Sequence, residues 1–236
     1  MSPVPAAPSA APLFDRGGWW DPACREFASL RSVTRFRLEL LRGWLPRPPA
    51  GLDVVDLGCG GGLLSVPLAR EGASVVAVDL ARQALAAGRA QPAPPWCAVV
   101  GDLAAVPVAD RSADLVLLAD VLEHVASPAA VVREATRLLR PGGHLFVNTI
   151  HRTRRSRWLA IVLGEGLGFI PRGTHEWHLF ITPEELDAMA VAHGLQRRRR
   201  TGEAPRLWAT LRQGAVVLRE SGSLAVGYAV LYRKEV

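Results

Sequence analysis

The stretch that decides the fold is VVDLGCGGG (54–62), which joins a β-branched apolar run to a helical pattern. Residues 52–58 predict a buried strand, and residues 63–72 predict a short helix that ends on a glycine. The glycines between them let a ligand approach the backbone and leave N–H groups free at the helix start. The stretch therefore predicts a strand, a ligand-binding loop and a helix in direct succession.

Strand and helix patterns alternate along the chain around this unit. Strands are predicted at 74–79, 97–102, 113–120, 144–150 and 226–234, and helices at 80–90, 127–140 and 182–194. Apolar strands that alternate with helices are typical of a parallel sheet covered on both faces, so the predicted fold class is α/β. Helical spacing of apolar residues also predicts one or two helices across 19–45, which we call the cap.

Length and composition favour a single domain. The chain has 236 residues, of which 49% are hydrophobic, so residues 19–236 are expected to form one unit. Residues 1–18 begin with proline and small side chains and predict a disordered tail without the features of a secretory signal. Cys24, Cys59 and Cys97 form no CxxC pair, which favours a reducing compartment.

The positive net charge does not by itself predict a nucleic-acid partner. The net charge is +6, yet Lys234 is the only lysine, so nearly all of the basic charge is arginine. That skew, together with the abundance of alanine and proline, is typical of coding from a GC-rich genome. We therefore expect no nucleic-acid binding, although a basic surface does attract anionic partners.

Three aspartates at predicted strand ends define the ligand. Asp79 follows Gly58 by 21 residues, the spacing of an acid that accepts hydrogen bonds from ribose hydroxyls, and Asp56 and Asp102 each stand at the end of another strand. The loop departs from the dinucleotide pattern G-x-G-x-x-G because Leu63 holds the sixth position. A carboxylate just before the loop is unfavourable for a pyrophosphate, but it suits the ammonium and sulfonium of S-adenosylmethionine.

These motifs carry a broad resemblance. The run Asp56 to Gly62 (DLGCGGG), followed by Asp79, Gly101-Asp102 and PGG (141–143), resembles the Rossmann-like S-adenosylmethionine-dependent methyltransferases. The resemblance covers about residues 50–150. It implies a mostly parallel seven-stranded sheet with an antiparallel last strand and helices on both faces.

A narrower resemblance extends from Trp19 to Leu186. It rests on WWDP (19–22), GCGGGLLSVPLAREGA (58–73), ADVLEHV (119–125) and IPRGTHEWHLFITPEEL (170–186). Together these segments resemble the ubiquinone-biosynthesis O-methyltransferases, which methylate phenolic hydroxyls on polyprenylated ring intermediates. The similarity fades afterwards, because a Tyr-Asn-Pro segment typical of that family is replaced by EAPRLW (203–208).

The resemblance implies a set of cofactor contacts. Arg37 would reach the carboxylate of the cofactor, Gly58 and Gly60 would line its methionine half, Asp79 would bind its ribose, Asp102 would bind its adenine edge, and Ala119 would contact it through the backbone. For Arg37, the alternative is an ordinary exposed arginine on a helix.

Candidate catalytic residues follow the fourth predicted strand. A phenol has a pKa near ~10, so at neutral pH its proton must pass to a base, or a metal must bind the oxygen. Asp120, Glu123 and His124 could coordinate a divalent cation such as Mg²⁺, or a carboxylate could orient His124 as general base. The family pattern has Glu where this chain has Asp120, which shortens the reach to a metal. A purely structural loop is the alternative, and His175 is a second candidate base.

Residues 151–175 (HRTRRSRWLAIVLGEGLGFIPRGTH), which we call the lid segment, begin with four arginines within 152–157 and continue with an apolar run from Trp158 to Ile170. The run is shorter than the ~20 residues that cross a bilayer. Arginines beside an apolar stretch are typical of a helix in a membrane interface, so we expect peripheral membrane contact through residues 152–170. The alternative is a covering helix packed on the core.

The leading functional hypothesis is O-methylation of a lipidic phenol or quinol precursor of ubiquinone at the cytoplasmic face of a bacterial membrane, or at the inner membrane if the protein is mitochondrial. Association with other quinone-biosynthesis enzymes is a further expectation. The divergent C-terminal third keeps open a methyltransferase for another small phenolic metabolite. A third hypothesis is a cofactor-binding subunit that supports a membrane-associated complex without catalysis.

Overall fold

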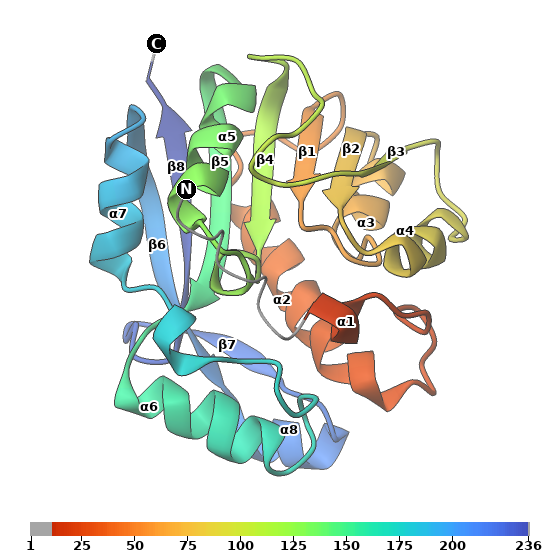
Figure 1. Cartoon of the computed structure of the whole chain (residues 1–236), viewed down its shortest axis with the longest axis vertical. Helices are drawn as coiled ribbons and strands as arrows, with labels where there is room; N and C mark the ends of the chain where they lie inside the picture. The colour runs from red at the N-terminus through yellow and green to blue at the C-terminus, as the bar shows by residue number, and fades with distance from the viewer. Residues whose placement is uncertain (1–10, 236) are drawn as a thin grey trace, which may run out of the picture.

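An eight-stranded sheet organises residues 11–235, the part of the chain that this computed structural model describes (Figure 1). In chain order the strands are β1 (Asp53–Leu57), β2 (Ser74–Asp79), β3 (Cys97–Val100), β4 (Ala113–Ala119), β5 (Leu139–Ile150), β6 (Leu195–Pro205), β7 (Leu218–Ser221) and β8 (Gly227–Lys234). Their spatial order is β3-β2-β1-β4-β5-β8-β6-β7. Strands β1 to β5 are parallel, as predicted.

Seven strands were predicted, but the sheet has eight within the described residues, so the predicted number is wrong by one. The predicted antiparallel last strand is confirmed as β8, which lies inside the sheet between β5 and β6 and pairs antiparallel with both. The additional strand is β7, which extends the sheet beyond β6 by antiparallel pairing. No strand was predicted for β6 or β7, since the arginine run at 197–200 lacks the apolar alternation that marks a strand.

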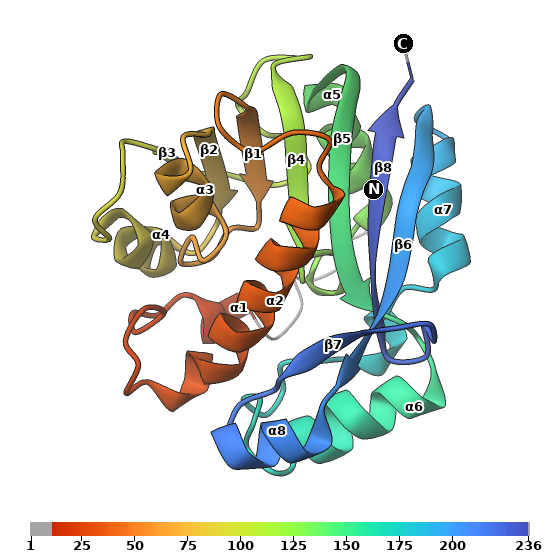
Figure 2. The ribbon, with the colours of Figure 1, turned by 180° about the vertical axis from the view of Figure 1, so that it is seen from behind.

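Helices cover both faces of the sheet because its strands are apolar on both sides. Helices α2 (Ala28–Trp44), α3 (Ser65–Arg70) and α4 (Arg82–Arg89) cover one face (Figure 2), and α5 (Pro128–Leu138) and α7 (Pro183–Val191) cover the other. Successive residues of β1 enter different clusters, with Val54 packed beneath α2 and Val55 on the opposite face. Each fully buried valine or leucine contributes about 1.5–3 kcal/mol to folding, so the sheet is a rigid platform.

The predicted helix starts of α5 and α7 are confirmed by their caps. Thr182 accepts a hydrogen bond from the backbone N–H of Glu185, and the Glu185 carboxylate accepts one from the N–H of Thr182. Ser127 accepts from the N–H of Ala130 at the start of α5. Such caps satisfy backbone donors that a helix end otherwise leaves unpaired.

Residues 11–18 of the predicted tail belong to the described part of the chain, whereas residues 1–10 lie outside it. Residues Ala11–Phe14 form the short helix α1, and the ring of Phe14 contacts the rings of Trp19 and His124. The cap continues through η1 (Arg25–Phe27) into α2. The sequence of the tail is poor in helix signals, so this contact with the site could not be anticipated.

The lid segment forms part of a second layer beyond the carboxyl end of β5 (Figure 1). Helix α6 (Arg154–Ser156) continues as η3 (Arg157–Glu165), which is wound as a π-helix, and the short η4 (Trp177–Leu179) follows. The C-terminal helix α8 (Leu207–Gln213) lies in the same layer in both ribbon views. None of the helices within residues 11–235 combines the length and apolar character that a membrane crossing requires.

Candidate active site

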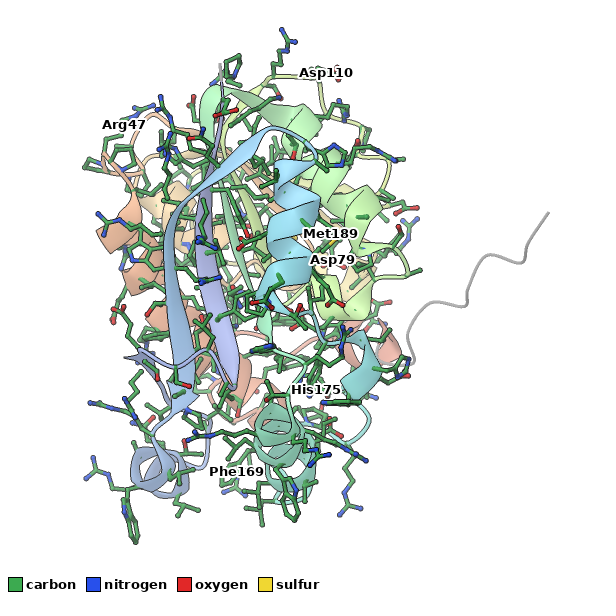
Figure 3. The ribbon with its side chains drawn as sticks, turned by 90° about the vertical axis from the view of Figure 1, so that its left-hand side faces the viewer. Arg47, Asp79, Asp110, Phe169, His175 and Met189 are labelled. Carbon is green, nitrogen blue, oxygen red and sulfur yellow. The ribbon has the colours of Figure 1, made fainter. Side chains whose placement is uncertain are left out.

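A cavity of about 1260 Å³ lies between the carboxyl edge of the parallel strands and this second layer. Ligands of open α/β sheets bind at that edge, outside the strand ends. The walls come from the cap, the glycine loop, the end of β4, the lid segment and α8. Figure 3 shows His175 at the junction between the sheet and the second layer, with Phe169 below it.

The glycine loop is held closely by the cap. Gly58 and Gly60 have φ values of +74° and +51°, a region that favours glycine. A Cβ atom on Gly60 would lie 2.4 Å from the ring of Trp19, so a side chain there would push the cap away. The indole N–H of Trp20 donates to the carbonyl of Gly61 at 2.7 Å. The WWDP motif therefore closes the cavity over the loop.

Asp79 and Asp102, predicted to bind the ribose and the adenine edge, lie on the cavity wall together with Ala119. Asp79 ends β2, and its carboxylate accepts hydrogen bonds from the N–H groups of Gly60 at 2.7 Å and Ala81 at 2.8 Å. Burial raises the pKa of Asp79 despite these bonds. A carboxylate has about four acceptor sites, so acceptor capacity is left for ribose hydroxyls. Asp102 is exposed at the rim and Ala119 ends β4, both lining the same cavity.

Asp56 gives the cavity its buried negative group. Its side chain is 2% exposed and accepts a hydrogen bond from the hydroxyl of Ser65 at 2.6 Å. Burial raises its pKa to about 7, and the nearby Asp79 adds to that effect. Within residues 11–235 no cation pairs with this carboxylate. A ligand that brings positive charge would supply the missing partner, so the donor set fits S-adenosylmethionine.

Arg37 is placed in the cavity wall by α2, but its guanidinium already has two carboxylate partners. It forms ion pairs with Asp120 and with Glu203, the latter at 2.8 Å, and its side chain is buried. Asp120 has a φ of +53° and also accepts a hydrogen bond from the amide of Asn148 at 3.1 Å. The expected contact between Arg37 and a cofactor carboxylate therefore stays a prediction, and that carboxylate would compete with two others.

Glu203 is a site residue that the sequence did not single out. It lies on β6, is 2% exposed, and sits in the EAPRLW segment where the family resemblance fades. Its position 166 residues from Arg37 left no local signal of the pair. A buried arginine on α2 requires a counter-ion, and this requirement was the signal that could have indicated a distant carboxylate partner.

Glu123 is turned away from the cavity, into the core. The hydroxyl of Thr149 donates to one carboxylate oxygen of Glu123 at 2.8 Å, while the other has no hydrogen-bond partner within residues 11–235. Burial raises the pKa of Glu123 to about 8, and repulsion from Asp120 contributes. Both effects favour the neutral, protonated form of Glu123.

His124 lies on the cavity wall between two rings. Its imidazole is 5.4 Å from the ring of Phe14 and 5.8 Å from that of His175. Burial lowers its pKa to about 4, and the neighbouring His175 lowers it further. Within the described residues the His124 ring has no hydrogen-bond partner, so the carboxylate that was expected to orient it is absent.

The predicted metal site does not fit the geometry. Asp120 turns to Arg37, Glu123 turns to Thr149, and His124 packs between rings, so their donor atoms do not converge. Within residues 11–235 no group of three or more His, Cys, Asp or Glu side chains could hold a metal ion. A protonated Glu123 is also a poor ligand for a hard cation, which prefers ionised carboxylates.

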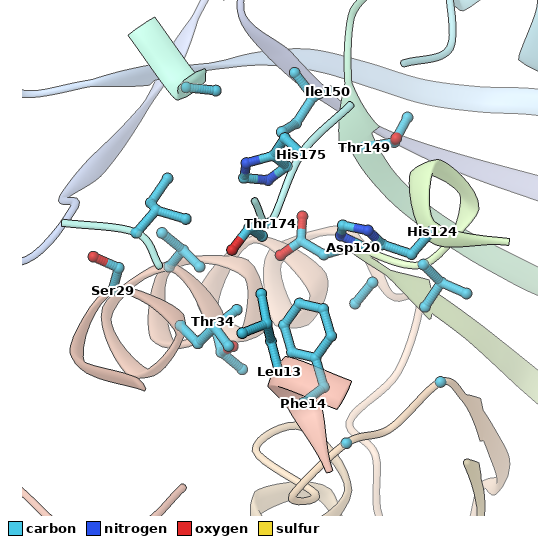
Figure 4. Close-up of a pocket in the computed structure, with 18 of the residues that line it drawn as sticks. Leu13, Phe14, Ser29, Thr34, Asp120, His124, Thr149, Ile150, Thr174 and His175 are labelled. Carbon is cyan, nitrogen blue, oxygen red and sulfur yellow. The ribbon is translucent and has the colours of Figure 1, made fainter. Parts of the chain in front are cut away.

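His175 has the carboxylate partner that His124 lacks. Its Nδ1 atom is 3.1 Å from a carboxylate oxygen of Glu165, and both residues belong to the lid segment. Figure 4 shows the rings of His175 and His124 on the cavity wall with Asp120 near them. In the sequence Glu165 is merely an interruption of the apolar run, so this partnership was missed.

Comparisons with known proteins agree with the geometry. A family model described as a methyltransferase domain matches residues 55–147. The ubiquinone biosynthesis O-methyltransferase of Ralstonia nicotianae is 42% identical over 183 residues, covering 75% of this chain and 76% of that protein. The protein of the same name from Methylobacterium sp. is 43% identical over 193 residues, with 75% and 76% covered.

A solved structure from Thermotoga maritima, a SAM-dependent methyltransferase described as a possible histamine N-methyltransferase, has the same fold. It aligns with a TM-score of 0.67 at 19% identity, covering 89% of this chain and 93% of that one. At that identity the likeness supports the fold only. The two relatives and the matching domain carry the assignment further: this chain belongs to the ubiquinone biosynthesis O-methyltransferase family of S-adenosylmethionine-dependent enzymes.

Proposed function

We propose that this enzyme uses S-adenosylmethionine to methylate a phenolic hydroxyl of a lipidic ubiquinone precursor. One observation carries the proposal beyond family membership. The cavity that holds Asp56 and Asp79 continues to apolar walls from two helices of the second layer. Those walls include Leu159 and Leu163 on η3 and Leu211 on α8. Pockets that take apolar ligands have this lining, with a few polar groups at one end.

The chain holds and orients the reactants. When bound, S-adenosylmethionine supplies an activated methyl group on a sulfonium. Asp56 offers the negative charge that a cationic ligand needs, and Asp79 retains acceptor sites for ribose hydroxyls. Alignment of the acceptor oxygen with the methyl carbon supplies much of the rate increase in such transfers. The cap over the glycine loop excludes water from that alignment.

We propose that the acceptor reaches the cavity from a membrane that the protein contacts peripherally, at the cytoplasmic face in a bacterium. The lid segment exposes Trp158 and Leu167, at 61% and 62%, and α8 exposes Trp208 at 86%. Exposed aromatic and aliphatic side chains on neighbouring helices are uncommon on a surface that faces only water. This support extends the predicted contact region from residues 152–170 to a second helix.

Unpaired arginines favour anionic lipid as the surface. Arg154, Arg155 and Arg172 are exposed on the lid segment, and none forms an ion pair within residues 11–235. Arg206 and Arg212, at the two ends of α8, are exposed in the same way. Each basic side chain near an anionic surface adds about 1 kcal/mol of attraction. The test is co-sedimentation with vesicles containing phosphatidylglycerol, compared with Trp158→Ser/Trp208→Ser; binding that is equal in both proteins contradicts the contact.

A second candidate is methylation of another small phenol. The observation that favours it is Glu203, which stands in the divergent segment and brings a carboxylate to the cavity wall. The association with other quinone-biosynthesis enzymes has no described surface that favours it, and it stays an expectation from the family.

Turnover tests the proposed function directly. Purified enzyme, S-adenosylmethionine and a polyprenylated catechol should give the monomethyl ether, detected by mass spectrometry, and product should be lost in Asp79→Ala. Addition of a chelator should leave the rate unchanged, because the predicted ligands do not converge on a metal. Binding of the cofactor without product from any catechol would support the non-catalytic subunit instead.

A further inference from the structure

The lid segment contains a buried carboxylate–imidazole pair that the proposed function has not used. Glu165 is 7% exposed, and its carboxylate accepts three hydrogen bonds: from the N–H of Gly173 at 2.8 Å, from the N–H of His175 at 2.9 Å, and from Nδ1 of His175 at 3.1 Å. A single carboxylate therefore fixes both the backbone and the ring of His175. Two partners ten residues apart in one segment form a rigid unit.

The pairing sets which nitrogen of His175 carries the proton. Burial works to raise the pKa of Glu165, but the hydrogen bonds from His175 and Gly173 outweigh it and lower the pKa. Glu165 is thus ionised at neutral pH and can only accept hydrogen bonds. Nδ1 of His175 must then be the donor, which leaves the lone pair on Nε2. This arrangement, a carboxylate behind an imidazole, prepares Nε2 to receive a proton.

His175 lies on the wall of the cavity that the acceptor must enter. His175 lines the cavity together with Asp120 and Ala119 at the end of β4 (Figure 4). Its side chain is 9% exposed, so the ring belongs to the cavity wall rather than to the outer surface. The ring centroids of Phe180 and of His124 each lie 5.8 Å from the ring centroid of His175.

We infer that His175, oriented by Glu165, is the general base that removes the proton of the acceptor hydroxyl, and that His124 is a neighbouring wall residue. The inference rests on the proposed function. It reverses the order that the sequence suggested, in which His124 ranked first. His124 has no orienting carboxylate, and its lowered pKa makes it a weak base for a phenol.

The step balances without any further reactant. The O–H proton of the phenol passes to Nε2 of His175, and the oxygen forms a bond to the methyl carbon. The carbon–sulfur bond breaks with its electron pair left on sulfur, which becomes a neutral thioether. The imidazolium, stabilised by the Glu165 carboxylate, then releases its proton to water after the ether leaves.

Three variants, assayed with a polyprenylated catechol, test the assignment of the base. His175→Gln keeps an amide donor for Glu165 but has no basic nitrogen, so kcat should fall about 100-fold or more. Its affinity for S-adenosylhomocysteine should stay within about twofold of wild type, because the residue acts on the acceptor. His178→Ala is the matched control, since His178 lies in the same chain region at 70% side-chain exposure and should leave kcat unchanged. His124→Ala should cost less than His175→Gln.

Glu165→Gln tests the positioning role separately. The groups that face His175 are Glu165, His124 and Asp120, and loss of the Glu165 charge removes the stabilisation of the imidazolium. The acid limb of the kcat/KM profile should therefore move to lower pH while kcat falls. A structural role for Glu165 would lower the amount of folded enzyme without moving the limb.

Two results overturn the assignment: a folded His175→Gln with more than half of the wild-type kcat, or a loss of turnover in His124→Ala that exceeds the loss in His175→Gln. If His175→Gln does not fold, His175→Ala with added imidazole decides, since recovery of turnover supports the base and absence of recovery contradicts it. A wild-type enzyme that gives no product would instead contradict the proposed function, so the two failures are distinguishable.

Discussion

The cavity has two halves that are built in different ways. The cofactor half (residues 53–119) uses side chains at the ends of neighbouring strands, close in sequence to the glycine loop. The acceptor half (residues 120–175 and 203–218) joins segments that are far apart in the chain, and Arg37 links two of them through its ion pairs with Asp120 and Glu203. A parallel sheet brings its strand ends together automatically, whereas the acceptor half depends on individual pairs. Function in the second half therefore rests on interactions that no short motif encodes.

The largest expected effect comes from removing Arg37, whose ion pairs connect α2 with the end of β4 and with β6. Arg37→Ala leaves the buried Glu203 and the partly buried Asp120 without a cation, so the free energy of unfolding should fall by about 3–5 kcal/mol. Urea denaturation measures this change in the free energy of unfolding. Arg42→Ala is the matched control on the same helix, because its exposed ion pair with Glu71 should be worth about 1 kcal/mol or less. Equal losses in both variants would show that the acceptor half does not depend on its buried pair.

Replacing Glu123 should have a smaller effect of opposite sign. In the native state its pKa is raised from the usual 4.5 to about 8, so between those pH values the folded protein holds a proton that the unfolded chain releases. Stability therefore declines as pH rises through this window. Glu123→Gln keeps the hydrogen bond from Thr149 and does not titrate, so it should be more stable near pH 8 by about 1–3 kcal/mol. Thermal melts of both proteins from pH 4 to pH 8 check this; parallel curves would contradict a buried protonated Glu123.

The cofactor half should respond to pH through Asp56. Burial raises its pKa from 3.8 to about 7, and a cationic ligand favours the ionised form. Affinity for S-adenosylmethionine should thus weaken as pH falls below about 7, by up to about tenfold per pH unit. Calorimetry in buffers of different ionisation enthalpy should detect proton release on binding. In Asp56→Asn the pH dependence should disappear, and its persistence would place the responsible group elsewhere.

The same contrast explains how much the sequence could predict. Asp56, Asp79 and the glycine loop lie where they were expected, because strand-end position follows from the strand pattern alone. Glu203 and Glu165 were missed, since one lies on an unpredicted strand and the other interrupts an apolar run.

The predicted metal site shows where residues close in sequence fail to form a site. Asp120, Glu123 and His124 are adjacent in sequence, but the positive φ of Asp120 and the short η2 helix (Leu122–His124) send their side chains in different directions. Spacing along the chain indicates convergence only where the local backbone is regular, and this loop is not.

The ratio of kcat/KM for two acceptors tests the central claim, that the acceptor half receives a lipidic phenol. The pair is a catechol with a polyprenyl tail and the same ring with a methyl group, assayed in detergent micelles so that both are equally accessible. Each CH₂ buried against the apolar walls is worth about 0.8 kcal/mol, so the ratio should exceed about tenfold in favour of the tail. Leu163→Asp/Leu211→Asp should reduce it. A ratio near one, or in favour of the short acceptor, would contradict the account and support a small soluble phenol as the substrate.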